Sequence, residues 1–516
     1  MSEPILISVA PEIAFQQEKL KDYLIEKKLL SSTDSYQIKK RSIDARNRRV
    51  KVNLTISVAI DDDKKTIVYK DVSASKKHVI IVGAGPAGLF AALRCIEIGL
   101  KPLVFERGKD VRVRRRDLAA IMKEHRVNPE SNYCFGEGGA GTYSDGKLYT
   151  RSKKKGDVKK VLETFVHHGA PQDILVDSQP HIGTNKLPQI ITAIREQIIA
   201  SGGEVHFDSK VTDFILEETE CKGIVLSDGK KVTGMATILA TGHSARDVFQ
   251  LLQKKGIEIN AKPYALGVRI EHSQELINKV QYHGYSTDYL PAANYKLVAQ
   301  VESGKGKKGV FSFCMCPGGF IVPAATEGGE IVVNGMSPSR RNSKYANSGI
   351  VVEINEKDWE AFDGSGQLAG MYFQQAIEKK ASELVGGTQQ APAQRLIDFL
   401  EDKKSTSLPD TSYQPGLVSV ELKKIFPEQV TVALKNGIRA FGKKMKEYLT
   451  NDAVLVGVES RSSSPVSIPR DKDSLEHISI KKLYPCGEGA GYAGGIVSAA
   501  IDGERCIDAI YCAKMK

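Results

Sequence analysis

The chain has 516 residues, with 73 Lys and Arg against 62 Asp and Glu, so its formal net charge is +11. Its 41% hydrophobic and 26% charged residues are typical of a folded globular protein and exclude a disordered chain. At roughly 100–200 residues per domain, this length predicts three or four domains. The basic excess is typical of proteins that meet a nucleic acid, a membrane surface or an anionic ligand.

No segment of the sequence is predicted to cross a membrane. The apolar stretch 79–93 is rich in glycine and ends at Arg94, well short of the length that a spanning helix needs. Residues 1–4 lack the basic start and apolar core of a secretory signal. Eight cysteines are spread along the chain without a CxxC pair. We therefore expect a cytoplasmic protein with no membrane partner, no zinc site and no bound metal.

The first 75 residues are predicted to form a small domain of their own. Their hydrophobic pattern indicates a strand at 5–9, an amphipathic helix at 11–30 and a hairpin of strands at 36–43 and 49–59. This order is a β-α-β-β unit. A polar linker at 71–77 separates it from the next apolar strand.

A glycine-rich turn follows that next strand. The strand begins at Val79, and the pattern GxGxxG leads into a helix at 87–99 and a second strand at 102–105. Gly83 would permit the tight turn, Gly85 would let backbone N–H groups approach a pyrophosphate, and Gly88 would let the helix pack closely on the strand. The positive end of the helix dipole would face the phosphates.

An acidic residue completes this pattern. Glu106 follows the second strand, 21 residues beyond Gly85, where a carboxylate can accept both hydroxyls of an adenosine ribose. The strand, turn, helix, strand and acid together predict a dinucleotide-binding Rossmann domain, which we assign to residues 76–256.

The remainder of the chain divides into two parts by pattern. Helices are predicted at 158–168 and 187–200, and strands at 205–217, 221–226 and 236–240. Residues 257–420 change to strands rich in Gly and aromatic residues, with helices at 367–386 and 391–401, and we interpret them as an inserted substrate domain. Residues 421–516 end in a strand, a Gly-rich turn and a helix, and are predicted to complete the first domain.

The sequence around the turn, GAGPAGLFAA…VFERG, resembles flavoproteins of the glutathione-reductase type, in which FAD is the permanent ligand. Residues 237–242 are similar to the "ATG" strand end of these proteins. Residues 483–491 are similar to their C-terminal segment, with Glu488 where Asp is usual. Val211 matches the position whose backbone recognises adenine, and Gly494-Gly495-Ile496 opens a helix whose amides would face the flavin.

The closest resemblance is to the uncharacterised FAD-dependent dehydrogenases, also described as NAD(FAD)-utilising. Four blocks carry it: residues 42–46, 135–148, 313–319 and 457–466. The resemblance implies an α/β fold with a Rossmann-like FAD-binding domain of the glutathione-reductase type, an inserted β-rich α+β substrate domain and FAD as the cofactor. The family is named by its cofactor, so the substrate stays open.

The candidate cofactor-binding residues follow from the fingerprint and from these resemblances. They are Gly83, Gly85, Pro86, Ala87, Gly88, Glu106, Arg107, Gly138, Gly139, Thr142, Ser144, Val211, Ala240, Thr241, Gly242, Gly487, Glu488, Gly494, Gly495 and Ile496.

Three residues are candidates for catalysis. Lys147 follows the long glycine block, and its charge would stabilise a reduced anionic flavin. Arg461 would bind a substrate carboxylate or donate a proton. Cys316 shares a strand face with Cys314, so the two form either a redox pair beside the flavin or small buried hydrophobic side chains.

We therefore predict an FAD-dependent oxidoreductase that transfers hydride between the flavin and a small organic, anionic substrate. No second GxGxxG is present, so NADH or NADPH would enter the same cleft transiently. The alternative is a flavoprotein that binds RNA through the basic segments 39–41 and 46–51. A third reading is a non-catalytic FAD sensor.

Overall fold

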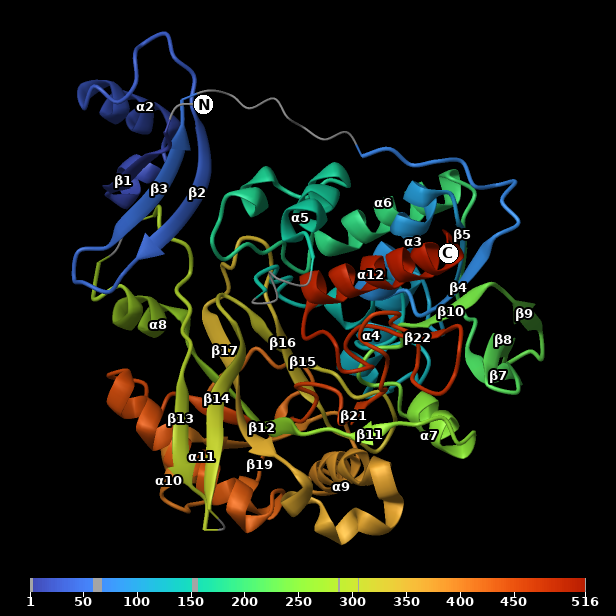
Figure 1. Ribbon diagram of the computed structural model, residues 1–516. Helices are drawn as coiled ribbons and strands as arrows, with labels where there is room; N and C mark the ends of the chain where they lie inside the picture. The colour runs from blue at the N-terminus through green and yellow to red at the C-terminus, as the bar shows by residue number, and fades with distance from the viewer. Residues whose placement is uncertain (1–2, 59–66, 151–155, 286–287, 305, 516) are drawn as a thin grey trace.

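The computed structural model describes residues 3–58, 67–150, 156–285, 288–304 and 306–515. Figure 1 shows a small N-terminal sheet beside two larger layers, one built on a parallel sheet and one on a long, mainly antiparallel sheet. The fold is therefore mixed α/β, as the sequence predicts.

The N-terminal unit is a three-stranded sheet in the order β1-β3-β2, with two helices packed on it. The predicted single helix over 11–30 is two helices, because residues 15 and 16 leave the helical conformation. Alternate residues of β3 are buried, which is the pattern of a strand with one face on a core. Residue 59, the predicted end of the hairpin, lies outside the described residues. The elements are β1 Ile5–Val9, α1 Pro11–Ala14, α2 Gln17–Glu26, β2 Gln37–Asp44 and β3 Lys51–Ser57.

The next layer is a five-stranded sheet in the order β22-β10-β4-β5-β6, in which every neighbouring pair is parallel. Its inner strands are short runs of buried apolar residues, as expected where helices cover both faces. The strands are β4 His78–Val82, β5 Lys101–Phe105, β6 Glu204–His206, β10 Ala236–Leu239 and β22 Leu483–Pro485. The C-terminal segment thus completes a sheet that the N-terminal half begins.

Helices and a small sheet surround this parallel sheet. Figure 1 shows α3, α6 and α12 together on one side, with α12 against α3. A β-carbon at Gly503 of α12 would lie 2.1 Å from the Ala87 carbonyl oxygen of α3, so the two helices are in backbone contact. The elements are α3 Pro86–Ile98, α4 Val111–Glu124, α5 Val158–His167, α6 Leu187–Ala200, β7 Val211–Glu217, β8 Glu220–Leu226, β9 Lys231–Thr233, α7 Arg246–Lys254 and α12 Ile496–Met515.

The second layer is a seven-stranded sheet in the order β13-β14-β17-β12-β20-β18-β19. A large hydrophobic core forms where the buried faces of these strands pack against α9 and α11. The elements are β12 Tyr264–Ser273, α8 Gln274–Gln281, β13 Val298–Glu302, β14 Lys307–Cys316, β17 Tyr345–Ile354, α9 Ala369–Glu383, β18 Ala391–Arg395, α10 Leu396–Leu400, β19 Leu417–Ser419, α11 Glu428–Lys444 and β20 Val454–Glu459.

Short elements connect the two layers. Paired strands are β11 Asn260–Ala261 with β21 Val466–Ser467, and β15 Phe320–Pro323 with β16 Val333–Met336. Short 3-10 turns are η1 Gly139–Gly141, η2 Gln172–Leu175, η3 Glu356–Asp358, η4 Glu360–Leu368 and η5 Leu422–Lys424.

The structure corrects three sequence predictions. The predicted helix 391–401 begins instead as strand β18, because residues 391–395 pair with β19 and β20. The predicted strand 205–217 is divided between β6 and β7, which belong to different sheets. The second layer extends beyond the predicted boundary at 420, since β20 pairs with β12 in the seven-stranded sheet.

Among the helices in the described parts of the chain, none is both long and apolar enough to cross a bilayer.

Candidate functional site

A cavity of about 390 Å³ lies where the two layers meet. Its lining includes the residues that directly follow β4, β5, β10 and β22, which are parallel neighbours, so their carboxyl ends share one edge of the sheet. Ligands of open parallel sheets bind at this edge. The opposite wall includes Phe313 and Cys314 of β14 and Asn334 of β16.

The predicted glycine turn forms the floor of the cavity, and each of its glycines has a distinct environment. A β-carbon at Gly83, where φ is +104°, would lie 2.4 Å from the carbonyl oxygen of Ala240. A β-carbon at Gly88 would lie 1.9 Å from the Gly83 oxygen, which confirms close packing of α3 on the strand. No atom lies within 4 Å of the position of a Gly85 β-carbon. Gly85 therefore presents backbone to open space at the N-terminus of α3, which suits a phosphate.

Glu106 is buried at the end of β5 and accepts three backbone hydrogen bonds. Its Oε2 accepts from the amide of Ala84 and its Oε1 from those of Gly108 and Gly136, each at 2.9 Å. A carboxylate offers about four lone-pair directions, so one is left to face the cavity. Glu106, which is predicted to bind the ribose, thus also connects the glycine turn to the loop that begins at Gly136.

A second glycine-rich loop, residues 136–146, crosses the floor. A β-carbon at Gly139 would lie 3.3 Å from the Cα of Gly85, so the two loops face each other closely. The loop is held by Arg114 of α4, a fully buried arginine that the sequence reading missed. Its guanidinium donates to the carbonyl oxygens of Asn132, Glu137 and Gly139 at 2.7, 2.8 and 3.0 Å.

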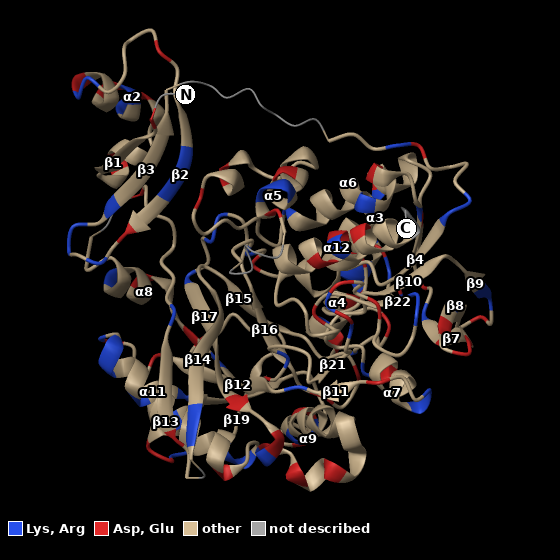
Figure 2. Ribbon diagram, in the orientation of Figure 1, with Lys and Arg blue, Asp and Glu red and all other residues tan. Residues whose placement is uncertain are grey.

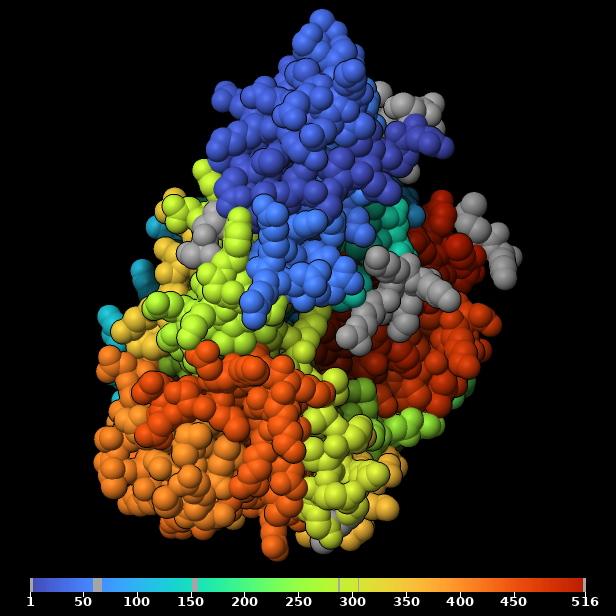
Figure 3. Space-filling view, turned by 90° about the vertical axis from the view of Figure 1, so that its left-hand side faces the viewer, coloured from blue at the N-terminus to red at the C-terminus, as the bar shows by residue number. Residues whose placement is uncertain are grey.

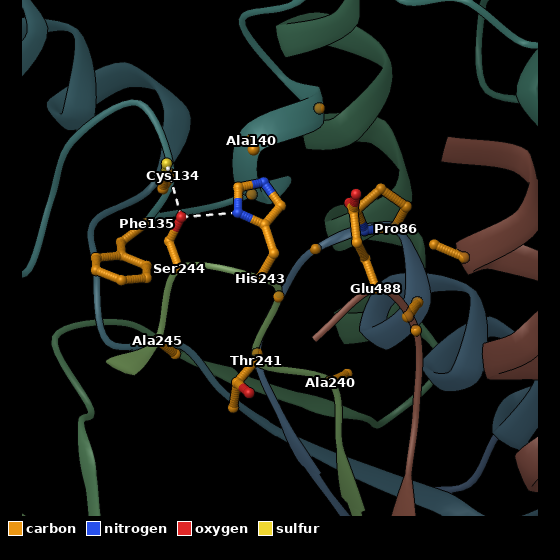
Figure 4. Close-up of a pocket in the computed structure, with 18 of the residues that line it drawn as sticks. Pro86, Cys134, Phe135, Ala140, Ala240, Thr241, His243, Ser244, Ala245 and Glu488 are labelled. Carbon is orange, nitrogen blue, oxygen red and sulfur yellow. Dashed lines mark hydrogen bonds between the residues drawn. The ribbon is translucent and has the colours of Figure 1, made fainter. Parts of the chain in front are cut away.

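The segment after β10 brings a second group of polar side chains into the cavity. His243 and Ser244 directly follow the predicted Ala240-Thr241-Gly242 strand end. Figure 4 shows Ser244 between His243 and Cys134, with Oγ 2.8 Å from His243 Nδ1 and 3.4 Å from the Cys134 sulfur. Burial and the neighbouring Arg461 charge lower the pKa of His243 to about 4. His243 is therefore neutral at physiological pH.

The C-terminal segment supplies the remaining predicted contacts. Gly487 and Glu488 follow β22, and Figure 4 places the Glu488 side chain beside Pro86. Burial raises the pKa of Glu488 to about 7, although the charge of Lys262 opposes this shift. Gly494 and Gly495 precede α12, and the space around their β-carbon positions is open. Two helix N-termini, those of α3 and α12, thus open onto one cavity.

One end of the cavity is closed by paired charges. Arg107 lies over the ring of Phe135, 4.3 Å from its centroid, and pairs with Glu130 and Asp247 at 2.7 and 2.8 Å. Lys210 pairs with the same two carboxylates. Val211 lines this end, where the resemblance places adenine.

The other end contains Lys147, together with Asp145, Cys314 and Asn334. Lys147 Nζ donates to the Met315 carbonyl oxygen and lies 4.0 Å from Asp145, which itself pairs with Arg341 at 2.6 Å. Burial lowers the pKa of Lys147, but Cys314, Cys316 and Asp145 together raise it above its usual value. Lys147 therefore keeps its charge. Nothing in the sequence indicated that Asn334 would reach this wall.

Arg461 lines the cavity, but its donors are already engaged. It donates to Glu378 at 3.1 and 2.9 Å, to Glu330 at 3.0 Å and to Thr326 at 2.8 Å. Arg246 of α7 pairs with the same two carboxylates. Burial would raise the pKa of Glu378, but the two arginines lower it to about 2. Arg461 belongs to a buried ion-pair network that joins the two layers. Its donors are used within this network, which argues against the predicted role in binding substrate.

Most of the candidate residues lie on the cavity wall, and four do not. Gly88 and Gly138 pack against neighbouring chain, and the Thr142 hydroxyl donates to the Glu137 carbonyl oxygen. Cys316 is buried behind Cys314, which replaces it at the wall. The remaining candidates line the cavity: Gly83, Gly85, Pro86, Ala87, Glu106, Arg107, Gly139, Ser144, Lys147, Val211, Ala240, Thr241, Gly242, Arg461, Gly487, Glu488, Gly494, Gly495 and Ile496.

The basic N-terminal unit projects from one end of the molecule (Figure 3), and its strand β2 carries several of its positive charges (Figure 2). Two of the arginines behind the RNA alternative are ion-paired. Arg46 pairs with Asp44 at 2.5 Å, and Arg41 pairs with Asp177 and Asp173 at 2.7 and 3.1 Å. The Arg41 pairs dock this unit on the segment after α5. Neither these contacts nor the comparisons below support RNA binding.

Comparisons with known proteins point to FAD as the ligand of this cavity. Residues 78–116 match a model of an FAD binding domain, residues 263–462 match "FAD-dependent protein, C-terminal domain-like", and residues 1–59 match a domain of unknown function. An uncharacterized protein of Clostridium beijerinckii is 44% identical over 486 residues, 90% of either chain.

Two further proteins are more distant. The human mitochondrial electron transfer flavoprotein-ubiquinone oxidoreductase is 26% identical over 249 residues, 43% of this chain and 38% of its own. The solved structure of the flavin-dependent brominase Bmp2 is 14% identical, with a TM-score of 0.36 over 85% of this chain and 79% of its own.

The parallel sheet, the glycine turn with the loop 136–146 that faces it, and the two open helix N-termini define an FAD-binding protein. The chain belongs to one family with the C. beijerinckii protein, and parts of it match the models of FAD-binding and FAD-dependent domains.

Proposed function

We propose that this protein is an FAD-dependent oxidoreductase that transfers a hydride between the flavin and a small organic anion, with NADH or NADPH as a transient reductant. The observation that carries the proposal is the continuity of one cavity from the glycine turn at Gly85 to the charged wall at Lys147. The adenosine would lie toward Glu106 and Val211 and the flavin toward Lys147, as the glutathione-reductase-type resemblance implies.

FAD supplies the hydride-accepting ring when it is bound, and the residues around it supply position and charge. The N-terminus of α3 favours the pyrophosphate, and that of α12 would face the flavin ring. Lys147 keeps its proton, and its nearest carboxylate, Asp145, is already neutralised by Arg341, so part of the Lys147 charge is left for an anionic ligand. Arg461 holds the wall through Glu330 and Glu378 and acts as a positioning residue.

Anaerobic mixing of the purified yellow protein with NADH or NADPH, and then with a panel of small oxidised carboxylates, tests the proposal through the visible absorption of the flavin. In Lys147→Met we expect FAD to stay bound, because the residues proposed to hold its adenosine and pyrophosphate, among them Gly85, Glu106 and Val211, are unchanged. Its kcat/KM for the anionic substrate should fall by roughly 10²–10³, the usual loss when one electrostatic group is removed. Lys159→Met, at an exposed position of α5, is the matched control.

The proposal fails if neither nicotinamide nor any member of the panel changes the flavin spectrum while dithionite still reduces it.

A further inference from the structure

Strand β14 contains an irregularity at the cavity wall. Its pairing with β17 passes from Phe313 opposite Gly349 to Cys316 opposite Asn347, so β14 carries one extra residue. This is a β-bulge, and Cys314 lies in it with φ of +43°. Few residues other than glycine adopt this conformation, and such residues are concentrated at functional sites.

The bulge brings two thiols together in different environments. Cys314 lines the cavity beside Lys147, whereas Cys316 is fully buried behind it. The Cys316 thiol donates to the Cys314 carbonyl oxygen at 3.2 Å. Cys314 is thus open to a ligand, and a second thiol lies against its backbone.

The surroundings favour a thiolate at Cys314. Lys147 Nζ donates to the carbonyl oxygen of Met315, the residue after Cys314. Arg269 donates to the Cys314 carbonyl oxygen at 2.9 Å. The facing carboxylates are paired elsewhere, Asp145 with Arg341 and Glu459 with Arg269 at 3.0 Å. The neighbouring Cys316 and the charges of Lys147 and Arg269 lower the pKa of Cys314 to about 5, although burial opposes this shift. The pKa of Cys316 is raised well above its usual value by Cys314 and by burial.

The i, i+2 spacing places the α-carbons of these two cysteines close to the separation of a disulfide. Two residues of fully extended chain span about 7 Å, just above the roughly 4.4–6.8 Å that separates the α-carbons of a disulfide. The span between these two α-carbons depends on the backbone angles of the intervening Met315, and a departure from full extension there brings it into this range. A disulfide closed over so small a ring would reduce easily, as expected of a catalytic bond and not of a structural one.

We propose that Cys314 and Cys316 form a redox-active thiol pair that exchanges two electrons with the FAD bound in this cavity. The Cys314 thiolate and the Cys316 thiol lose two electrons and one proton as the S–S bond forms, and FAD takes up these two electrons and one proton. In the reverse direction the reduced flavin opens the disulfide. The pair extends the oxidoreductase function proposed above, and its chemistry adds thiols and disulfides to the compounds that this cavity can serve.

The test is an anaerobic dithionite titration of the FAD-loaded protein after mild oxidation with diamide and removal of the reagent. Wild type should consume two electron pairs per flavin, one for FAD and one for the disulfide. Cys314→Ser and Cys316→Ser should each consume one pair. Peptide mass mapping of the oxidised wild type should show Cys314 and Cys316 joined and protected from alkylation, a readout that requires neither a variant nor a substrate.

A second pair of neighbouring thiols requires a control. Cys486 and Cys506 lie within 4.8 Å of each other beside Asp502, and a disulfide between them would add the same electron pair. Cys506→Ser should therefore keep the uptake of two pairs, and the exposed Cys512→Ser should do so as well.

The proposal is overturned if wild type takes up one electron pair per flavin, or if the extra pair disappears in Cys506→Ser and the mapped disulfide is Cys486–Cys506. Because dithionite reduces the flavin whatever the substrate, these outcomes do not depend on whether the panel of small anions reacts.

Discussion

The two ends of the cavity are built in different ways. At the adenosine end, the turn at Gly83, Gly85 and Gly88 and the acid Glu106 come from one continuous stretch of chain, and their places follow from spacing alone. At the other end, Lys147, Cys314 and Asn334 come from a loop, a bulge and a strand that are far apart in the sequence. A continuous motif carries its geometry with it, whereas a wall assembled from distant segments depends on how two sheets meet.

A buried network joins the two layers beside the cavity, and removing it should have the largest effect. Glu378→Gln leaves Arg246 and Arg461 with too little negative charge in a buried site, and should lower the free energy of unfolding by about 3–5 kcal/mol. Thermal and urea unfolding measure the loss. Glu383→Gln, at an exposed position on the same helix, should unfold as wild type does. Equal stability of the two variants would show that the layers are held together by other contacts.

Gly85→Val should affect the adenosine end alone. No atom lies within 4 Å of the added β-carbon, so the chain should fold, but the side chain would occupy the space that a pyrophosphate needs. We expect FAD affinity to fall at least about 100-fold, which corresponds to roughly 2.7 kcal/mol. Fluorescence titration of the FAD-free protein measures it, with Gly328→Val, another uncrowded glycine, as control. Retained affinity would mean that the phosphates bind elsewhere.

Glu488→Gln should change the response to pH, with the smallest effect. The pKa of Glu488 in the folded protein is about 7, above the usual 4.5, so the folded state holds this proton more tightly than the unfolded state. Its contribution to stability is full below pH 4.5 and is lost as pH rises to about 7. Because the carboxyl group faces the cavity, we expect a loss of about 1 kcal/mol over this window.

Unfolding midpoints of the FAD-free protein from pH 4.5 to 7 measure this slope. The Gln variant should lack this part of it, whereas Glu327→Gln, at an exposed position, should keep it. An identical slope in all three proteins would place the titration on another group.

Much of the fold could be predicted from hydrophobic periodicity. The β-α-β-β unit and the strand–turn–helix around Gly85 are local patterns, and the structure has them. The strand β18 was misread as a helix because its residues 391–395 become a strand only through pairing with β19 and β20. The boundary at 420 was missed because β20 completes a sheet that begins at β12, almost 200 residues earlier.

The candidate site also has a part that local sequence predicts and a part that depends on distant segments. The glycines and Glu106 could be found because each has a physical reason that is visible in its neighbours. Arg461 was placed on the cavity wall, but Glu330 and Glu378, which engage its donors, come from other segments that spacing cannot relate to it. Between the two cysteines of one strand, the bulge at Cys314 decides which one faces the cavity, and a regular strand pattern does not predict a bulge.

Arg114 has a consequence for the order of assembly. Its guanidinium binds the carbonyl oxygen of Asn132 and, in the loop opposite Gly85, those of Glu137 and Gly139, so protein groups alone fix the shape of this loop. A site that is rigid beforehand loses little conformational entropy when it captures its ligand. We therefore expect newly made chains to complete folding first and to load their cofactor afterwards.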